Sequence, residues 1–198
     1  MVYQPVIPIT GYGGWKFLES TFDKQFEGFT DSASVRNDRE YFQEKMSSPV
    51  AIEDFLSDRR LLRISLTSFD LGGEEWKVGF LRHMMEEQAD PDSSFLKRLN
   101  SPAYTAFATT FTVTDGKISL SQDTIASLAD DFERAAFRSA VGNVDNNMKL
   151  SLNYEAKVGD LVREGSSDEA NLYRLLGDVP TRTVLETGLN LPTSWHQL

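Results

Sequence analysis

Large apolar residues recur along much of the chain at intervals of three and four. Between residues 15 and 29 they fall at Trp15, Leu18, Phe22, Phe26 and Phe29, which places them on one face of a helix. Similar stripes predict helices that end at Met46, begin at Ser48-Pro49, run from Trp76 to about Asp90, and span residues 121–141. This succession of helices predicts an all-α fold with a single multihelical domain.

Two stretches alternate between apolar and polar residues instead. Residues 111–120 alternate around Asp115-Gly116, a dipeptide that favours tight hairpin turns, and they predict one small β-hairpin. The stretch MKLSLNYE, residues 148–155, also alternates and could form a strand. The window from Asp145 to Gly165 is too long for a common strand and contains no proline, so helix is favoured there.

Three segments align without gaps and predict an internal repeat. They are DRRLLRISLTSFDL, NSPAYTAFATTFTV and DVPTRTVLETGLNL, which start at Asp58, Asn100 and Asp178. Each starts with a residue that caps helices well and ends with two apolar residues around a central one. With the short apolar helix before each, they predict three helix-turn-helix-like units at about 50–71, 93–113 and 169–191. Phe69, Phe111 and Leu189 are expected at equivalent buried positions. The alternative is that any capped amphipathic helix shares this pattern.

Residues 1–14 are predicted to be an extended lead-in to a domain that spans residues 15–198. Its GYGG stretch does not have the spacing of a phosphate-binding loop and is preceded by two prolines rather than by a strand. The lead-in is nevertheless apolar. It is expected either to lie on its own domain or to serve as a partner surface, through Val6, Ile7, Ile9 and Tyr12.

Composition and charge exclude several classes of protein. The formal net charge of −10 and the lack of a basic patch argue against binding to nucleic acids or anionic membranes. Arg59, Arg60 and Arg63 lie beside Glu53, Asp54 and Asp58, which predicts ordinary pairing within helices. No apolar run is long enough to cross a bilayer, and the first residues do not resemble a signal peptide. A cytoplasmic protein without membrane insertion is therefore expected.

No motif supports catalysis, a metal or a cofactor. The chain has no cysteine, and its histidines, His83 and His196, are far apart, so a tetrahedral zinc site has no ligand set. The adjacent acids Asp130 and Asp131 point apart on a helix, and no nucleophile elbow is present. The sequence predicts no enzymatic activity, no catalytic residues and no cofactor.

The runs DRRLLRISLTSFDL, NNMKLSLNYE and LETGLNLPTSW together resemble the alphaproteobacterial family known as domain of unknown function 1217. The resemblance extends over nearly the whole chain, from Gly11 to Trp195. The chain departs from the family at Asp70 and Asn190, where members usually have glycine. The resemblance implies a mostly helical fold and genes that often lie near flagellar genes, and it implies no reaction.

The leading hypothesis is therefore a non-enzymatic protein that binds other proteins and assists or forms part of the bacterial flagellar apparatus. An exported component and a cytoplasmic assembly factor both agree with the sequence, and the oligomeric state is left open. The alternative is a small-molecule sensor or an enzyme with a pocket between helices. An enzyme should show a pocket with perturbed acids, whereas a binding protein should show an exposed apolar surface.

Overall fold

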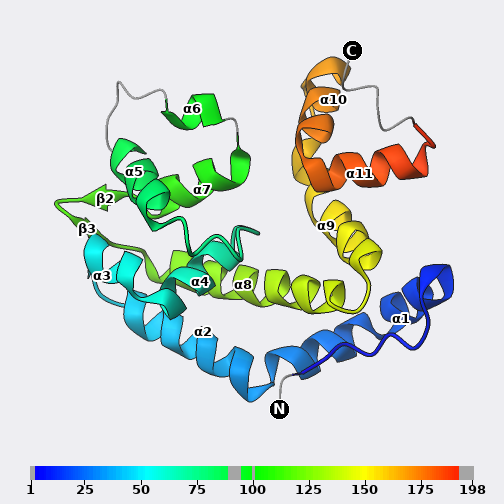
Figure 1. Ribbon diagram of the computed structural model, residues 1–198, viewed down its shortest axis with the longest axis horizontal. Helices are drawn as coiled ribbons and strands as arrows, with labels where there is room; N and C mark the ends of the chain where they lie inside the picture. The colour runs from blue at the N-terminus through cyan, green and yellow to red at the C-terminus, as the bar shows by residue number, and fades with distance from the viewer. Residues whose placement is uncertain (1–2, 89–94, 100, 192–198) are drawn as a thin grey trace. The chain divides into compact units, whose positions relative to one another are not determined.

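A computed structural model describes residues 3–88, 95–99 and 101–191 of the chain (Figure 1). Helices account for 72% of the described residues, so the predicted all-α fold is confirmed. The chain divides into two compact units. Unit 1 consists of residues 1–3 and 23–137, and unit 2 of residues 4–22 and 138–198. The long helices α1 (Gly11–Thr30) and α8 (Gln122–Gly142) each begin in one unit and end in the other.

Unit 1 contains most of the hydrophobic core. Of the 29 buried apolar residues among those described, 25 belong to this unit. An aromatic cluster lies at its centre, where Phe107 and Phe111 contact each other and both contact Phe55. Besides its parts of α1 and α8, the unit contains α2 (Ala33–Met46), α3 (Ile52–Ser57), α4 (Arg59–Thr67), α5 (Val78–Gln88), α6 (Phe95–Leu99) and α7 (Pro102–Thr110).

The predicted hairpin is present and belongs to a three-stranded sheet. Strands β2 (Val113–Thr114) and β3 (Lys117–Ile118) pair antiparallel, and Asp115 and Gly116 between them both have positive φ, as the tight hairpin turn requires. A third strand, β1 (Val50–Ala51), pairs with the other side of β3. The helix expected from Ser48-Pro49 therefore begins only at Ile52, because the preceding two residues extend the sheet.

Unit 2 contains α9 (Asn146–Leu161), α10 (Asp168–Gly177) and α11 (Val179–Gly188), besides the first part of α1 and the end of α8 (Figure 1). The stretch MKLSLNYE lies within α9, so helix was the correct choice. The Asp145 carboxylate caps this helix by accepting from the backbone N–H groups of Asn147 and Met148. Among the described residues of unit 2, the buried apolar side chains besides Pro5 are Leu18, Val141, Met148 and Leu152.

The lead-in is shorter than predicted, because α1 begins at Gly11 rather than at Trp15. Glycine is needed at position 14 because the chain folds back there. A β-carbon on Gly14 would lie 1.8 Å from the carbonyl oxygen of Ile9. The GYGG stretch is thus the first helical turn, and its glycines permit a close approach of the preceding backbone.

Candidate interaction surface

The N-terminal residues predicted as a partner surface are partly packed on α1. Within unit 1, the Tyr3 ring lies edge-on to Phe29, with ring centroids 5.9 Å apart, and it also borders Gly28. Within unit 2, Pro5 is buried and the Ile9 side chain borders Gly13. These contacts favour packing on the chain itself. Val6, Ile9 and Tyr12 are still exposed, whereas Ile7 is half-buried.

Exposed large apolar side chains are concentrated in unit 2. Among the described residues, eleven of the twelve lie in this unit, and the other one is Trp76 of unit 1. Five of the eleven belong to α10, α11 and the turn that follows: Leu172, Tyr173, Val179, Leu189 and Leu191. We call these five residues the α10–α11 surface. Such a concentration of apolar side chains is typical of surfaces that bind other proteins.

A single aspartate links α10 to α11, and the same arrangement links α3 to α4. The Asp178 carboxylate accepts from the backbone N–H of Thr181 at 3.0 Å and from its hydroxyl at 2.5 Å. The Asp58 carboxylate accepts from the backbone N–H groups of Arg60 at 3.1 Å and Leu61 at 3.0 Å. Each aspartate therefore closes one helix and caps the next.

The helices α4 and α11 also end alike. Asp70 and Asn190 both adopt the left-handed conformation, with φ of 59° and 52°. The backbone N–H of the following leucine, Leu71 or Leu191, donates in each case to the carbonyl five residues earlier at 2.9 Å. This is the hydrogen bond that closes a Schellman turn. The helix pairs α3–α4 and α10–α11 thus share the aspartate that links their helices and the turn that ends the second helix. Their first helices begin differently, because α3 follows Ala51 without a side-chain cap, whereas the Ser167 hydroxyl caps α10.

The third aligned segment does not share these features. Its first residue, Asn100, and residues 93 and 94 lie outside the described residues, and α7 is preceded by Ser101 as N-cap. Thr112 is not among the described residues with positive φ. After Phe111 the chain continues directly into β2, because the hairpin begins there.

The two helix pairs differ in what covers them. Phe69, just after α4, is half-buried and lies against Phe107 and Phe111 of the α7 segment, with ring centroids 5.7 and 6.1 Å away. Leu189 holds the position of Phe69 in the second pair and is 65% exposed. The prediction that Leu189 is buried like Phe69 and Phe111 is therefore wrong, because no described helix of unit 2 covers it as α7 covers Phe69.

The same contrast holds at two further pairs of positions. Ile52 is 8% exposed, whereas Leu172, its counterpart 120 residues later, is 52% exposed. Leu71 is 9% exposed, whereas its counterpart Leu191 is 41% exposed. Three apolar positions that unit 1 covers are therefore open in unit 2.

Two buried positions of α11 hold polar residues where α4 has leucines. Leu61 and Leu66 of α4 correspond to Thr181 and Glu186 of α11, and all four are buried. Asn153 of α9, the helix against which α11 packs, is also buried, and its side-chain oxygen has no hydrogen-bond partner among the described residues. Burial of polar groups contributes less to stability than burial of leucine. In α11, the fully buried positions are thus held by polar residues, whereas Val184 and Leu185 are half-buried and Val179 is exposed.

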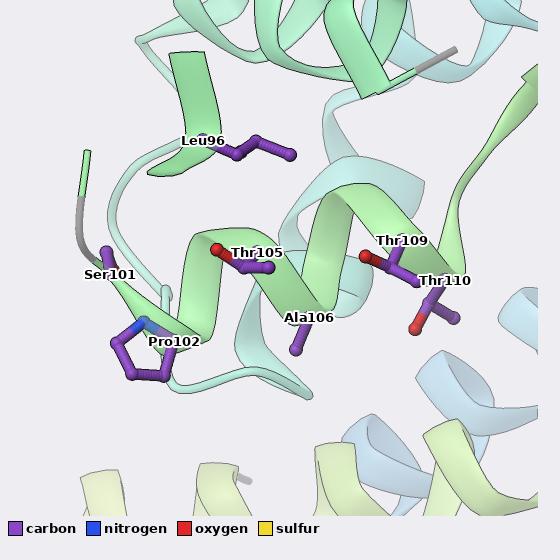
Figure 2. A pocket seen from close by; sticks show the side chains of 7 residues that line it. All are labelled: Leu96, Ser101, Pro102, Thr105, Ala106, Thr109 and Thr110. Carbon is purple, nitrogen blue, oxygen red and sulfur yellow. The ribbon is translucent and has the colours of Figure 1, made fainter. Parts of the chain in front are cut away.

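A groove of about 500 Å³ runs along α7 in unit 1 (Figure 2). Small residues at helical spacing line it, so it follows one exposed face of that helix. None of the side chains that line it is a carboxylate, an imidazole or an amine, and the groove therefore offers no group for acid or base chemistry. The lining residues are Leu96, Ser101, Pro102, Thr105, Ala106, Thr109 and Thr110.

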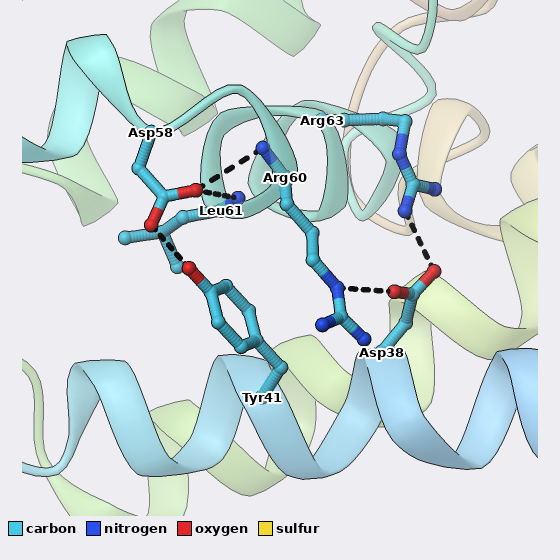
Figure 3. A network of polar contacts seen from close by, with 6 residues as sticks. All are labelled: Asp38, Tyr41, Asp58, Arg60, Leu61 and Arg63. Carbon is cyan, nitrogen blue, oxygen red and sulfur yellow. Dashed lines mark hydrogen bonds and ion pairs between the residues drawn. The ribbon is translucent and has the colours of Figure 1, made fainter.

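A cluster of charged residues joins α2 to α4 (Figure 3). The Asp38 carboxylate accepts from Arg60 at 2.7 Å and from Arg63 at 2.6 Å. The Tyr41 hydroxyl donates to Asp58, and the Arg60 guanidinium lies over the Tyr41 ring. Arg60 and Arg63 therefore pair with a carboxylate of another helix, whereas the sequence had predicted pairing within helices. The cluster fastens α2 to α4.

Burial and hydrogen bonding act in opposite directions on Asp58. Burial alone would raise the pKa of its carboxyl, but hydrogen bonds from the backbone of Leu61 and from Tyr41 stabilise the charged form and bring the pKa below its ordinary value. The hydrogen bond to Asp58 in turn raises the pKa of Tyr41. Both directions agree with a structural role for this cluster.

Net charge is distributed unevenly between the two units. Unit 2 contains seven lysines and arginines and nine aspartates and glutamates, so its formal charge is −2 and unit 1 holds the remaining −8 of the chain. The other bases of residues 138–191, which include Arg174 of α10 and Arg182 of α11, are half-buried. The exposed charged side chains of these residues are five acids and one base. They are Glu155, Asp160, Glu164, Asp168, Glu169 and Arg163.

Residues that could support other functions are dispersed. His83 is exposed on α5, where its ring lies against Phe95 and its Nδ1 is 3.9 Å from a Glu87 oxygen. His196 lies outside the described residues. Within the described ranges, no histidines and carboxylates gather into a group that could hold a metal ion. Nor is any helix of those ranges long and apolar enough to cross a membrane.

Comparison with known proteins places the chain in a family. Its fold is similar to a crystal structure of a protein from Agrobacterium tumefaciens, solved by structural genomics, with a TM-score of 0.71 and 21% identity. The match covers 95% of this chain and 81% of the other. No curated protein matches the chain. The model of a family described as "Protein of unknown function (DUF1217)" matches residues 68–198, a shorter span than the expected Gly11 to Trp195, and the chain therefore belongs to this family.

Proposed function

We propose that the protein is a non-enzymatic binding protein that holds another protein at its α10–α11 surface. The observation that supports this most directly is the exposure of Leu172, Tyr173 and Leu189 in a unit with few buried apolar residues. A few well-packed side chains supply most of the free energy in protein–protein association, and tyrosine is enriched among them. The side chains that line the groove on α7 include no ionisable group, so this groove does not supply the perturbed acids expected of an enzyme.

The proposed partner is a component of the flagellar apparatus, and the proposed place of binding is the cytoplasm. This part rests on the resemblance that the sequence bears to a family encoded near flagellar genes. It agrees with an assembly factor that shields apolar surfaces of flagellar components before they assemble. An exported flagellar protein with the same surface is the alternative.

The experiment is affinity purification from flagellated alphaproteobacterial cells with three forms of the tagged chain. They are the wild type, Leu172→Asp with Leu189→Asp, and the matched control Trp76→Asp, which alters the exposed apolar residue of unit 1. We expect identified flagellar proteins to co-purify with the wild type and the control and to be lost with the double variant. Equal recovery with all three forms would overturn the proposal, and fractionation of the same cells tests the cytoplasmic location.

A further inference from the structure

The first helix pair indicates what the second one lacks. In unit 1, the aromatic residues Phe107 and Phe111 are four residues apart on the α7 segment. Both contact Phe55 of α3, and both contact Phe69 after α4. One amphipathic helix therefore covers the α3–α4 pair through two large side chains on one of its faces.

The α10–α11 pair presents the same positions without such a helix. Leu175 corresponds to Phe55 and is half-buried, and Leu189 corresponds to Phe69 and is exposed. Both pairs share the backbone bond from the third residue after the linking aspartate to its carboxylate, and both share the closing bond of the Schellman turn. The backbone that would receive the covering helix is therefore formed in both pairs. The two pairs differ in that α7 covers the first, whereas no described helix covers the second in the same way.

We infer that the occupant of the α10–α11 surface is an amphipathic helix of a partner protein, with large apolar residues four positions apart and lysines or arginines beside them. This inference rests on the proposed function and specifies the class of its partner. We expect basic residues in the partner because Asp168 and Glu169 are exposed beside Leu172 on α10, and opposite charges favour association. The acids at 155, 160 and 164 are exposed as well.

The charge distribution argues against two other occupants. A second copy of this chain would bring its own acidic residues against those of the first, which costs free energy. An anionic membrane surface would be repelled by the same residues. A basic helix meets both the apolar and the acidic features of the surface, as in other complexes in which a helix lies in a groove.

The test uses three fluorescent peptides of 18 residues and the full chain. The first peptide is amphipathic, with phenylalanine or leucine at i, i+4, i+7 and i+11 and lysine elsewhere on its polar face. The second has the same composition in scrambled order, and the third has glutamate in place of lysine. Fluorescence anisotropy at 150 mM salt should show the first peptide binding at least about tenfold more tightly than either of the others.

Variants separate specific binding from simple attraction between opposite charges. Leu172→Asp with Leu189→Asp adds negative charge, so nonspecific attraction of the lysine peptide would rise, whereas loss of an apolar site should weaken binding about tenfold or more. Trp76→Asp adds negative charge in unit 1 and should leave the affinity unchanged. Circular dichroism shows whether the aspartate variant is folded. If it is not, Leu172→Ser with Leu189→Ser removes the same two apolar side chains without adding charge.

Several results would overturn the inference. They are equal binding of the lysine and scrambled peptides, equal binding of the glutamate peptide, or unchanged affinity in both double variants. A dimer in sedimentation experiments that dissociates with Leu189→Asp would identify a second copy as the occupant instead. If the double variant loses its cellular partner but no peptide discriminates, the proposed function stands and this inference fails.

Discussion

Phe69 and Leu189 stand at the same place in two helix pairs built alike, and only Phe69 is covered. Phe69 lies edge-on to Phe107, with ring planes inclined at 83°, whereas Leu189 is 65% exposed. An aspartate caps α4 and α11 through the backbone N–H three residues later, and the same Schellman hydrogen bond ends both helices. The local sequence therefore fixes the conformation of each pair, and the surrounding helices decide whether its apolar positions are buried.

Truncation of these two side chains should have unequal effects on stability. Phe69→Ala removes contacts with two aromatic rings and should lower the free energy of unfolding by about 3 kcal/mol. Leu189→Ala removes an exposed side chain and should change it by less than about 0.5 kcal/mol. Urea denaturation followed by circular dichroism measures both. Equal losses would mean that Leu189 is covered in solution.

Substitution at Gly14 should disturb the fold more than substitution at Gly13. A β-carbon at position 14 meets the backbone oxygen of Ile9 at 1.8 Å, whereas at position 13 the nearest atom, at 2.7 Å, is the flexible end of the Ile9 side chain. We expect Gly14→Ala to cost about 1–3 kcal/mol and to expose residues 3–10 to proteases. Gly13→Ala is the control and should be close to neutral, since alanine favours helix.

Glycine in place of the left-handed residues should stabilise the chain. Asp70 and Asn190 have positive φ, which costs a residue with a β-carbon roughly 1 kcal/mol and costs glycine little. Asp70→Gly and Asn190→Gly should each raise the free energy of unfolding by about 0.5–1 kcal/mol. Ser68→Gly is a matched control in right-handed conformation and should lower it. A loss of stability in both glycine variants would show that the Asp70 and Asn190 side chains stabilise their turns.

The contribution of Asp58 should depend on pH in a defined direction. Hydrogen bonds from Leu61 and Tyr41 lower its pKa in the folded protein below the ordinary value of 3.8. The charged form therefore stabilises the fold fully above pH 3.8, and this contribution is lost as the pH falls through the folded-state pKa.

Asp58→Asn keeps a capping side chain but removes the charge, and it should cost about 1 kcal/mol at pH 7. The difference from the wild type should shrink as the pH is lowered below 3.8. Asp54→Asn, at an exposed position on α3, is the control and should leave the stability at pH 7 nearly unchanged. A difference between Asp58→Asn and the wild type that stays constant down to pH 2 would contradict the role of the charge.

Periodicity and turn residues predicted much of the secondary structure. The spacing of apolar residues located α1, α2, α5 and α8, and Asp115-Gly116 located the hairpin, because both signals lie within a few neighbouring residues. Strand β1 was missed because a two-residue strand depends on pairing with Lys117 and Ile118, more than sixty residues away. The division into two units likewise depends on contacts between distant segments.

The exposed apolar residues of the proposed interaction surface could have been predicted from the alignment of the repeat. Thr181 and Glu186 stand where the first copy has Leu61 and Leu66, so α11 could not bury an apolar face like that of α4. The apolar lead-in was predicted as the partner surface instead, because its composition stands out locally. That choice overlooked the contact of Tyr3 with Phe29, which no local pattern predicts.

The uneven distribution of charge gives the two units opposite tendencies in solution. The formal charge of −8 on unit 1 favours repulsion between neighbouring copies, over a distance that shortens as salt is added. The exposed leucines of unit 2 favour association. Sulfate shortens the range of the repulsion and strengthens apolar association at the same time. The acidic unit thus keeps the chain dispersed at low ionic strength, and colloidal stability is expected to decline as sulfate is added.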